Sequence, residues 1–194
     1  MSEETMGRRE RKKAQTRQAL ADAALRLFLE RGYENVGVRD VAEAADVAVT
    51  TLFKHFPSKE ALVFDEDEGQ EEALVSSVRD RAPGQSVLGA LRDHIVSTRG
   101  TFPHEEPGFV AMLDLVRSTP ALRDYMHRMW MRHEEALAAA LTEAFGVPEG
   151  DVRVAALAHY VMEIPRLAHD REDPPEAMNA VFDMLERGWG GLEP

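Results

Sequence analysis

The stretch AADVAVTTLFKHFPSKEAL, residues 44–62, decides the fold class of this chain. Its pattern predicts the end of one short helix, a tight turn at Asp46, and a second short helix that ends before Pro57. Two helices joined by a three- or four-residue turn form a helix-turn-helix, whose second helix can enter the major groove of DNA. The stretch therefore predicts a DNA-reading element.

The residues of this element fit the geometry of a helix-turn-helix at three places. Ala42 supplies a small side chain where the two helices cross, and Leu52 supplies an apolar anchor for the second helix, with Val47 and Phe56 beside it. The turn needs a residue that tolerates a positive φ. Asp46 occupies this position. A positive φ is less favourable for Asp than for Gly, but Asp adopts it more often than most other residues do. We therefore expect Asp46 to adopt a left-handed backbone conformation.

The charge of the chain looks unfavourable for DNA binding until it is divided along the sequence. The formal net charge is -12, but residues 1–64 hold 11 basic against 10 acidic side chains and residues 65–194 hold 12 against 25. The segment at 8–17 is strongly basic, with only Glu10 opposing it. Because salt screens charges beyond roughly 10 Å, the local potential governs contacts with phosphates. The acidic remainder does not exclude DNA binding by the first third of the chain.

Composition excludes several other classes of protein. The 194 residues include no cysteine, which excludes disulfides, thiolate catalysis and cysteine-based zinc sites. The first residues, MSEETMGRRERKK, lack the apolar core of a signal peptide. No stretch approaches the roughly 18 apolar residues that a membrane span needs. We expect a soluble, cytoplasmic protein that makes no contact with a membrane.

Helical periodicity continues through almost the whole chain, and no convincing strand is found. The expected fold is all-α with about nine helices, in which a three-helix DNA-binding domain precedes a larger helical domain. Ser58 and Ser86 are expected to cap helices, and Pro120 stands at a first helical position. We place the DNA-binding domain at 8–57 and the second domain at 58–194. The expected helices are 14–31, 38–45, 49–55, 58–81, 86–99, 108–117, 120–145, 150–170 and 174–188.

The second helix of the motif presents candidate DNA contacts on its outward face. Its outward residues include Val49, Thr50 and Lys54, with Thr51 and Phe53 along the flanks. Such a helix directs its N-terminal side chains at base edges, whereas hydroxyls, imidazoles and ammonium groups also bind phosphates. The full set of candidate DNA-binding residues is Arg11, Lys12, Lys13, Arg39, Val49, Thr50, Thr51, Phe53, Lys54, His55 and Lys59.

Residues 14–62 resemble the N-terminal domain of the tetracycline-repressor (TetR) family of bacterial regulators. The resemblance rests on RGYENV, then VRDVAEAADV, then TTLFKHFPSKEAL. It implies that Val49, Thr50 and Lys54 face bases, and that Thr51, Phe53, His55 and Lys59 approach phosphates. The chain departs from the family pattern at four positions: Gly37 in place of Ser or Thr, Asp46 in place of Gly, Ala48 in place of Ser, and Phe53 in place of Tyr.

The same resemblance implies a ligand-binding and dimerising role for residues 65–194. The segment TPALRDYMHRMWMRHEEALAAALTEAFG, residues 119–146, is similar to members whose C-terminal domains bind acyl-CoA-like ligands. Residues 102–133 are dense in methionine and aromatic side chains, which predicts an apolar effector site, although ordinary helix packing gives the same pattern. The candidate ligand residues are His94, Phe102, Phe109, Met112, Met126, Met129, Trp130 and His133. The candidate dimer-interface residues are Ala155, His159, Met162, Met178, Phe182 and Leu185.

The sequence thus favours a homodimeric transcriptional repressor that binds a palindromic double-stranded operator and responds to a small, apolar effector. Two alternatives remain at this point: a helical protein-interaction module, and an all-helical enzyme that uses His and Glu chemistry. We expect no enzyme, because no set of acid, base and nucleophile can be picked out. We also expect no cofactor and no metal, because His159 and Glu163 share a helical spacing but no third ligand is evident.

Overall fold

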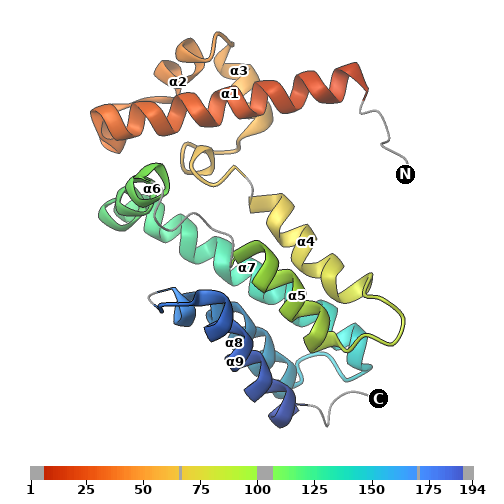
Figure 1. Ribbon diagram of the computed structural model, residues 1–194. Coiled ribbons are helices and arrows are strands. Elements are labelled where there is room, and N and C mark those ends of the chain that lie inside the picture. Colours follow the sequence, from red (N-terminus) through yellow and green to blue (C-terminus); the bar gives the residue numbers. More distant parts are fainter. Residues whose placement is uncertain (1–6, 66, 100–106, 170, 190–194) are drawn as a thin grey trace. The chain divides into compact units, whose positions relative to one another are not determined.

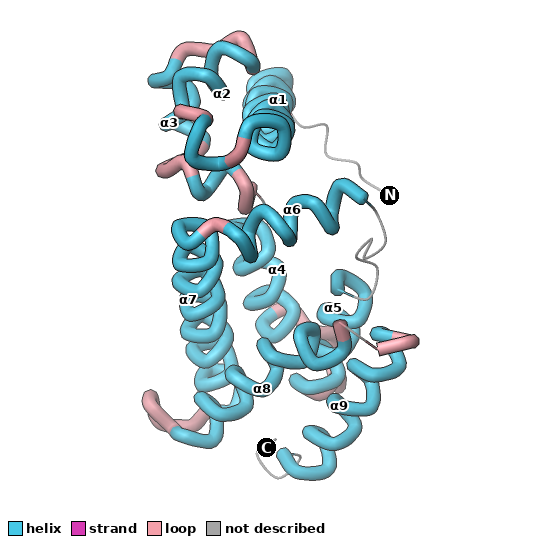
Figure 2. The backbone as a smooth tube through the Cα atoms, turned by 90° about the vertical axis from the view of Figure 1, so that its left-hand side faces the viewer, coloured by secondary structure: helices cyan, strands magenta, loops and turns pink. Residues whose placement is uncertain are grey.

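The structure is a computed structural model in which residues 7–65, 67–99, 107–169 and 171–189 are described. All regular structure in these ranges is helical, with nine α-helices and two 3₁₀ turns and no strand (Figures 1 and 2). The all-α prediction is confirmed for the described residues. The elements are α1 (Arg8–Arg31), η1 (Tyr33–Asn35), α2 (Val38–Ala44), α3 (Val49–His55), η2 (Glu60–Leu62), α4 (Asp67–Arg79), α5 (Val87–Arg99), α6 (Pro107–Ser118), α7 (Pro120–Phe145), α8 (Val152–Ala168) and α9 (Pro174–Trp189).

The chain folds into two compact units, and each unit is built from two separate stretches of the sequence. The first, here called the head unit, comprises residues 1–67 and 104–126, and the second unit comprises residues 68–103 and 127–194. Helix α7 contributes its first turns to the head unit and the rest to the second unit. The functional division at residue 57 remains a prediction.

The core of the head unit forms because α1 carries one apolar stripe. Leu20, Ala24, Leu27 and Phe28 recur at helical spacing and are all almost fully buried. They pack in one cluster with Leu52 of α3 and with residues of α2, η1 and η2. Figure 1 shows α1 beside α2 and α3. Side chains from α6 and from the start of α7 complete this cluster: Leu115, Val116 and Leu122.

Two helix starts differ from the sequence prediction. Helix α1 begins at Arg8, so the basic segment at 8–17 forms its first turns. The helix predicted from 58 begins only at Asp67. Ser58 does accept a hydrogen bond from the amide of Ala61 at 3.3 Å, but i to i+3 bonds then close a 3₁₀ turn instead of an α-helix. Residues 63–65 therefore form a short connecting segment between η2 and α4.

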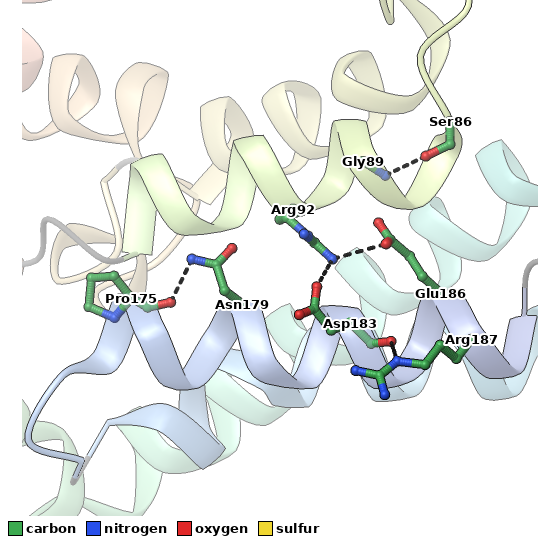
Figure 3. Close-up of polar contacts among 8 residues, drawn as sticks. All are labelled: Ser86, Gly89, Arg92, Pro175, Asn179, Asp183, Glu186 and Arg187. Atoms are coloured by element: carbon green, nitrogen blue, oxygen red, sulfur yellow. Dashed lines mark hydrogen bonds and ion pairs between the residues drawn. The ribbon is translucent and has the colours of Figure 1, made fainter.

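In the second unit, α5, α8 and α9 pack together around a shared apolar core. Ser86 caps α5 as predicted, since its hydroxyl accepts a hydrogen bond from the amide of Gly89 at 3.0 Å (Figure 3). Arg92 of α5 joins α9, where its guanidinium lies 2.6 Å from Asp183 and 3.1 Å from Glu186 (Figure 3). One arginine thus ties α5 to α9, the last helix of this unit. None of the described helices has the length and apolar character required to cross a membrane.

Candidate nucleic-acid interface

The turn between α2 and α3 has the geometry of a Schellman motif. Asp46 has a φ of 54°, as predicted, and no other described residue except glycine has a positive φ. The amide of Asp46 donates to the carbonyl of Glu43 at 3.1 Å, and the amide of Val47 donates to the carbonyl of Ala42 at 2.9 Å. These two bonds satisfy carbonyls at the end of α2 that have no partner within the helix. The turn therefore fixes the direction in which α3 leaves α2.

Helix α2 is held at its other end by one acidic side chain. Gly37 is the N-cap of α2, but glycine has no side chain that can accept from the first amides of the helix. The other half of a capping box is present, because the carboxylate of Asp40 reaches back and accepts a hydrogen bond from the Gly37 amide at 2.7 Å. Arg39 lies next to this carboxylate in the first turn and is exposed. It remains a candidate phosphate contact.

Helix α3 presents a mixed polar and aromatic face to solvent. Thr50 and Lys54 are exposed, and Phe53 is exposed by 50%. Thr51 is half-buried. Val49, which the sequence places among the outward residues, is also half-buried and packs against the head core. Because only part of Val49 reaches the surface, Thr50 and Lys54 are the more exposed candidates for base contacts on α3.

The side chain of Lys59 is anchored inside the head unit. Its ammonium donates a hydrogen bond to the backbone carbonyl of Tyr33 and lies over the rings of Tyr33 and Phe28. Burial lowers the pKa of Lys59, and the carboxylates of Glu34 and Glu60 oppose this shift. Sequence reasoning missed this internal role, because a lysine beside a DNA-reading helix fits a phosphate contact equally well.

His55 lies at the C-terminal end of α3 in a positive environment. Its side chain is half-buried, and its Nδ1 atom is buried with no hydrogen-bond partner among the described residues. Burial is the largest cause that lowers the pKa of His55, and the charges of Arg17 and Lys13 lower it further. A phosphate beside this imidazole has the opposite effect on the pKa, because a nearby negative charge favours the protonated form.

The basic residues of α1 do not all face the same way. Lys13, Arg17 and Leu20 are spaced four and three residues apart, so they share one face of α1, and Leu20 is buried in the head core. Lys13 is close enough to His55 to affect its pKa. Arg11 and Lys12 are exposed and lie on other faces of the helix. Among the three predicted contacts in this segment, Lys13 is the one directed toward α3.

The predicted ligand residues fall into both compact units. Phe109, Met112 and Met126 belong to the head unit, where Met112 packs against the head core. Phe102 lies outside the described residues. In the second unit, His133 is only 1% exposed and its Nε2 atom lies 3.8 Å from a carboxylate oxygen of Glu71. The remaining predicted ligand residues of this unit are His94, Met129 and Trp130.

Four of the six predicted dimer-interface residues are buried inside the protomer. Met162, Met178, Phe182 and Leu185 belong to the core of the second unit, so their assignment to a surface was wrong. Helical spacing identifies an apolar face but does not say whether the same chain covers it. The other two, Ala155 and His159, are exposed. No three His, Asp or Glu side chains gather as a metal site anywhere in the described part of the chain.

Comparison with known proteins accounts for both parts of the chain. Residues 20–65 match the family described as bacterial regulatory proteins, tetR family, and residues 85–190 match the family described as MftR C-terminal domain. MftR of Mycobacterium tuberculosis, whose name links it to the regulation of mycofactocin biosynthesis, is 25% identical over 92% of this chain and 93% of its own length.

Two further proteins are similar to this chain. The HTH-type transcriptional regulator TcmR of Streptomyces glaucescens is 32% identical over 74% of this chain, and the match spans 65% of TcmR. The solved structure of a TetR-family regulator from Streptomyces coelicolor A3 superposes with a TM-score of 0.60 at 20% identity, over 98% of each chain, which shows a shared fold. Together with the helix-turn-helix geometry, these matches identify the chain as a member of the TetR family of bacterial transcriptional regulators, with a C-terminal domain of the MftR type.

Proposed function

We propose that this protein is a homodimeric, ligand-responsive repressor that binds a palindromic DNA operator in the cytoplasm without catalysing a reaction. The observation that supports this most directly is the exposed face of α3. Thr50, Phe53 and Lys54 are held outward there by the positive-φ turn at Asp46. A helix of this kind enters the major groove, and two such helices in a dimer read half-sites roughly 34–36 Å apart.

The proposed dimer forms through the exposed faces of α8 and α9. Apolar side chains there are unusually exposed: Val152 by 76%, Tyr160 by 51%, Leu167 by 47% and Met184 by 61%. Large apolar side chains that several turns of two packed helices leave exposed are typical of an interface with another protein. Because a homodimer with two-fold symmetry uses the same surface on both subunits, one such face is sufficient.

The proposed effector site lies in the second unit, around His133. This imidazole is almost fully buried, Met129 beside it is buried, and Trp130 packs against the apolar core. A few polar groups within an apolar surround are typical of sites for small ligands. We propose that the effector is apolar and, more specifically, that it is an acyl-CoA. Effector binding lowers operator affinity by favouring a protein conformation that spaces the two reading helices wrongly for successive grooves.

Operator binding is tested by a gel shift on DNA that flanks the protein's own gene, with random DNA of equal length as the competitor. We expect a preference of at least about a thousandfold at about 150 mM salt, as is usual for specific binding. Equal affinity for the two DNAs would contradict the proposed function. The variant Lys54→Ala serves as the matched control, because it removes an exposed charge from α3 without removing any buried group.

Effector binding is tested by calorimetry with a series of fatty acyl-CoAs, using CoA alone and the free fatty acids as controls. We expect affinity to rise with acyl-chain length, by about 0.8 kcal/mol for each buried methylene group. His133→Leu is expected to weaken binding while the protein stays folded. Binding of CoA alone as tightly as of its long-chain esters would contradict an apolar site.

A further inference from the structure

The guanidinium of Arg17 joins three parts of the head unit. Its Nη1 donates a hydrogen bond of 2.7 Å to the backbone carbonyl of His55, and its Nη2 donates to the backbone carbonyl of Asp65. The guanidinium lies over the ring of Phe56, and its Cζ atom is 4.4 Å from the ring centroid. Phe56 is itself only 1% exposed. Arg17 is therefore a structural residue of the head, although its position in the basic segment suggests a contact with DNA.

The two carbonyls that Arg17 binds belong to segments with different roles. The carbonyl of His55 is one of the last four of α3, and such carbonyls find no N–H donor within their own helix. The carbonyl of Asp65 belongs to the connecting segment 63–65, through which the chain passes from η2 into α4. Because a guanidinium presents its donors in a rigid planar fork, it fixes these two carbonyls relative to each other.

The connecting segment has a second anchor on its neighbouring residue. The ring of Phe64 stacks on the ring of Tyr125, with centroids 5.3 Å apart and an interplanar angle of 15°. Tyr125 lies in the first turns of α7, and this helix continues without a break to Phe145. The segment 63–65 is thus held by α7 through Phe64 and by the end of α3 through Asp65 and Arg17.

We propose that Tyr125, Phe64 and Arg17 form a relay that positions the reading helix α3. A displacement of the start of α7 moves Phe64, the connecting segment follows, and Arg17 transmits the movement to the C-terminal end of α3. Arg17 is in this view a positioning residue whose charge meets backbone carbonyls and not phosphates. The regulatory meaning of the relay rests on the proposed function, because a change at α7 then alters operator binding.

The relay is tested by a double-mutant cycle in the full-length protein with Arg17→Gln, Tyr125→Leu and the double variant. Lys13→Gln is the matched control, because Lys13 lies one turn away on the same face of α1 and also affects His55. The first measurement is hydrogen exchange at the amide of Phe56, which donates to the carbonyl of Leu52 at 2.9 Å and so reports on the end of α3. The second is the ratio of affinities for operator and random DNA.

We expect each single variant of the relay to speed exchange at Phe56 by about tenfold, the equivalent of one lost hydrogen bond to a charged group. The double variant is expected to add little to Arg17→Gln, because both changes interrupt one path. The same variants lower the operator preference, whereas Lys13→Gln weakens binding to both DNAs equally. Independent, additive effects of Arg17→Gln and Tyr125→Leu at Phe56 would overturn the relay.

Arg17→Lys separates positioning from charge, since lysine keeps the positive charge but cannot bridge both carbonyls in a fixed fork. We expect it to behave like Arg17→Gln, and full rescue by lysine would overturn the positioning role. Where Arg17→Gln does not fold, as judged by circular dichroism, the cycle is completed with Arg17→Lys. Exchange in the free protein needs no DNA, so a failure of the relay is distinguishable from a failure of operator binding.

Discussion

The ammonium of Lys59 donates a hydrogen bond of 2.6 Å to the backbone carbonyl of Tyr33 and lies 3.8 Å from the centroid of that residue's own ring. The hydroxyl of Tyr33 in turn donates to the carboxylate of Glu60 at 2.9 Å. These contacts join η2, which follows the reading helix, to η1, which follows α1. A lysine ammonium has three donors, so this arrangement leaves capacity for the phosphate contact that the sequence predicts.

We expect Lys59→Met to destabilise the head by about 1–3 kcal/mol, because the Tyr33 carbonyl loses a charged partner and the ring loses its cation contact. The control is Lys54→Met, which removes an exposed charge from α3. This control is expected to weaken DNA binding with no change in thermal stability. Melting followed by circular dichroism distinguishes the two, and equal melting temperatures for both variants would show that the Tyr33 contacts contribute nothing.

A series at Asp46 separates backbone strain from charge. Because Asp46 is in the left-handed region, with φ of 54°, Asp46→Gly is expected to stabilise the turn by up to about 1 kcal/mol. Asp46→Ala is expected to destabilise it, since alanine lacks the short polar side chain that tolerates this conformation. Both changes remove the same negative charge, and so does Asp46→Asn. Chemical denaturation measures the stability order, which we expect to be Gly first and Ala last.

The same series tests the effect of charge on DNA. All three variants at Asp46 remove a carboxylate that lies two residues before the Ala48 cap of the reading helix. We expect all three to bind random DNA more tightly than the unchanged protein, by a similar factor, because a repulsion from phosphates is lost. A gain in Asp46→Gly alone would assign the effect to the turn conformation and not to the charge.

The features that the sequence predicts well are those set by neighbouring residues. The positive φ at Asp46, the Ser86 cap and the buried stripe of α1 all depend on local chemistry or on one helical period. The features that it misses depend on which distant segment covers a given face. Met162 and Phe182 fit a dimer interface as well as an internal core, and only the packing of α5, α8 and α9 decides between them.

The assignment of basic residues follows the same rule. The composition of the segment at 8–17 predicts contacts with phosphates, yet Arg17 is bound to two backbone carbonyls. The carbonyl of Asp65 lies 48 residues further along the chain. It is available only because the predicted helix from 58 gives way to a 3₁₀ turn and a connecting segment. No periodicity in α1 itself carries that information.

Because of the imidazole of His55, we expect acid to have opposite effects on the stability of the protein and on its affinity for DNA. Its pKa is lowered in the folded protein from the ordinary value of 6.5, chiefly by burial. Between the two pKa values the unfolded state binds more protons, so the stability of the free protein falls as the pH falls. Phosphates favour the protonated imidazole, so operator affinity is expected to rise as the pH falls from neutral toward the lowered pKa of His55 in the free protein, by at most about tenfold per pH unit for one proton.

The pH effect on DNA binding is measured by fluorescence anisotropy at constant ionic strength. His55→Gln is the control, because glutamine keeps a hydrogen-bonding side chain but does not titrate. We expect this variant to lose most of the pH dependence of operator affinity. A pH dependence that survives in His55→Gln would place the titrating group elsewhere in the complex.

One lysine substitution and one arginine substitution in α1 compare the contributions that two faces of that helix make to DNA binding. Lys13 lies on the face directed toward α3, whereas Arg11 is exposed on another face. We expect Lys13→Gln to reduce the slope of log affinity against log salt concentration by about 1 in each subunit, because one phosphate contact is lost. Arg11→Gln carries the same change of charge and is expected to leave this slope nearly unchanged. Equal slopes for the two variants would show that α1 contributes only a diffuse charge.

A single charge on the exposed face of α8 is expected to separate the proposed dimer. Tyr160 is 51% exposed, and Tyr160→Glu places a carboxylate where two copies of α8 and α9 are proposed to meet. The matched control is Met131→Glu, because Met131 of α7 is 50% exposed and the change from apolar to acidic is the same. Burying an unpaired carboxylate costs several kcal/mol for each ion. Two such groups therefore weaken the dimer strongly.

Sedimentation equilibrium measures this dissociation, and circular dichroism confirms that each variant remains helical. We expect Tyr160→Glu to be monomeric at micromolar concentration and to bind the operator weakly, since a lone head contacts only one half-site. Met131→Glu is expected to remain dimeric with unchanged operator affinity. If both variants stay dimeric, the subunits meet through a surface other than α8 and α9, and the exposed Val152 and Met184 then need another explanation.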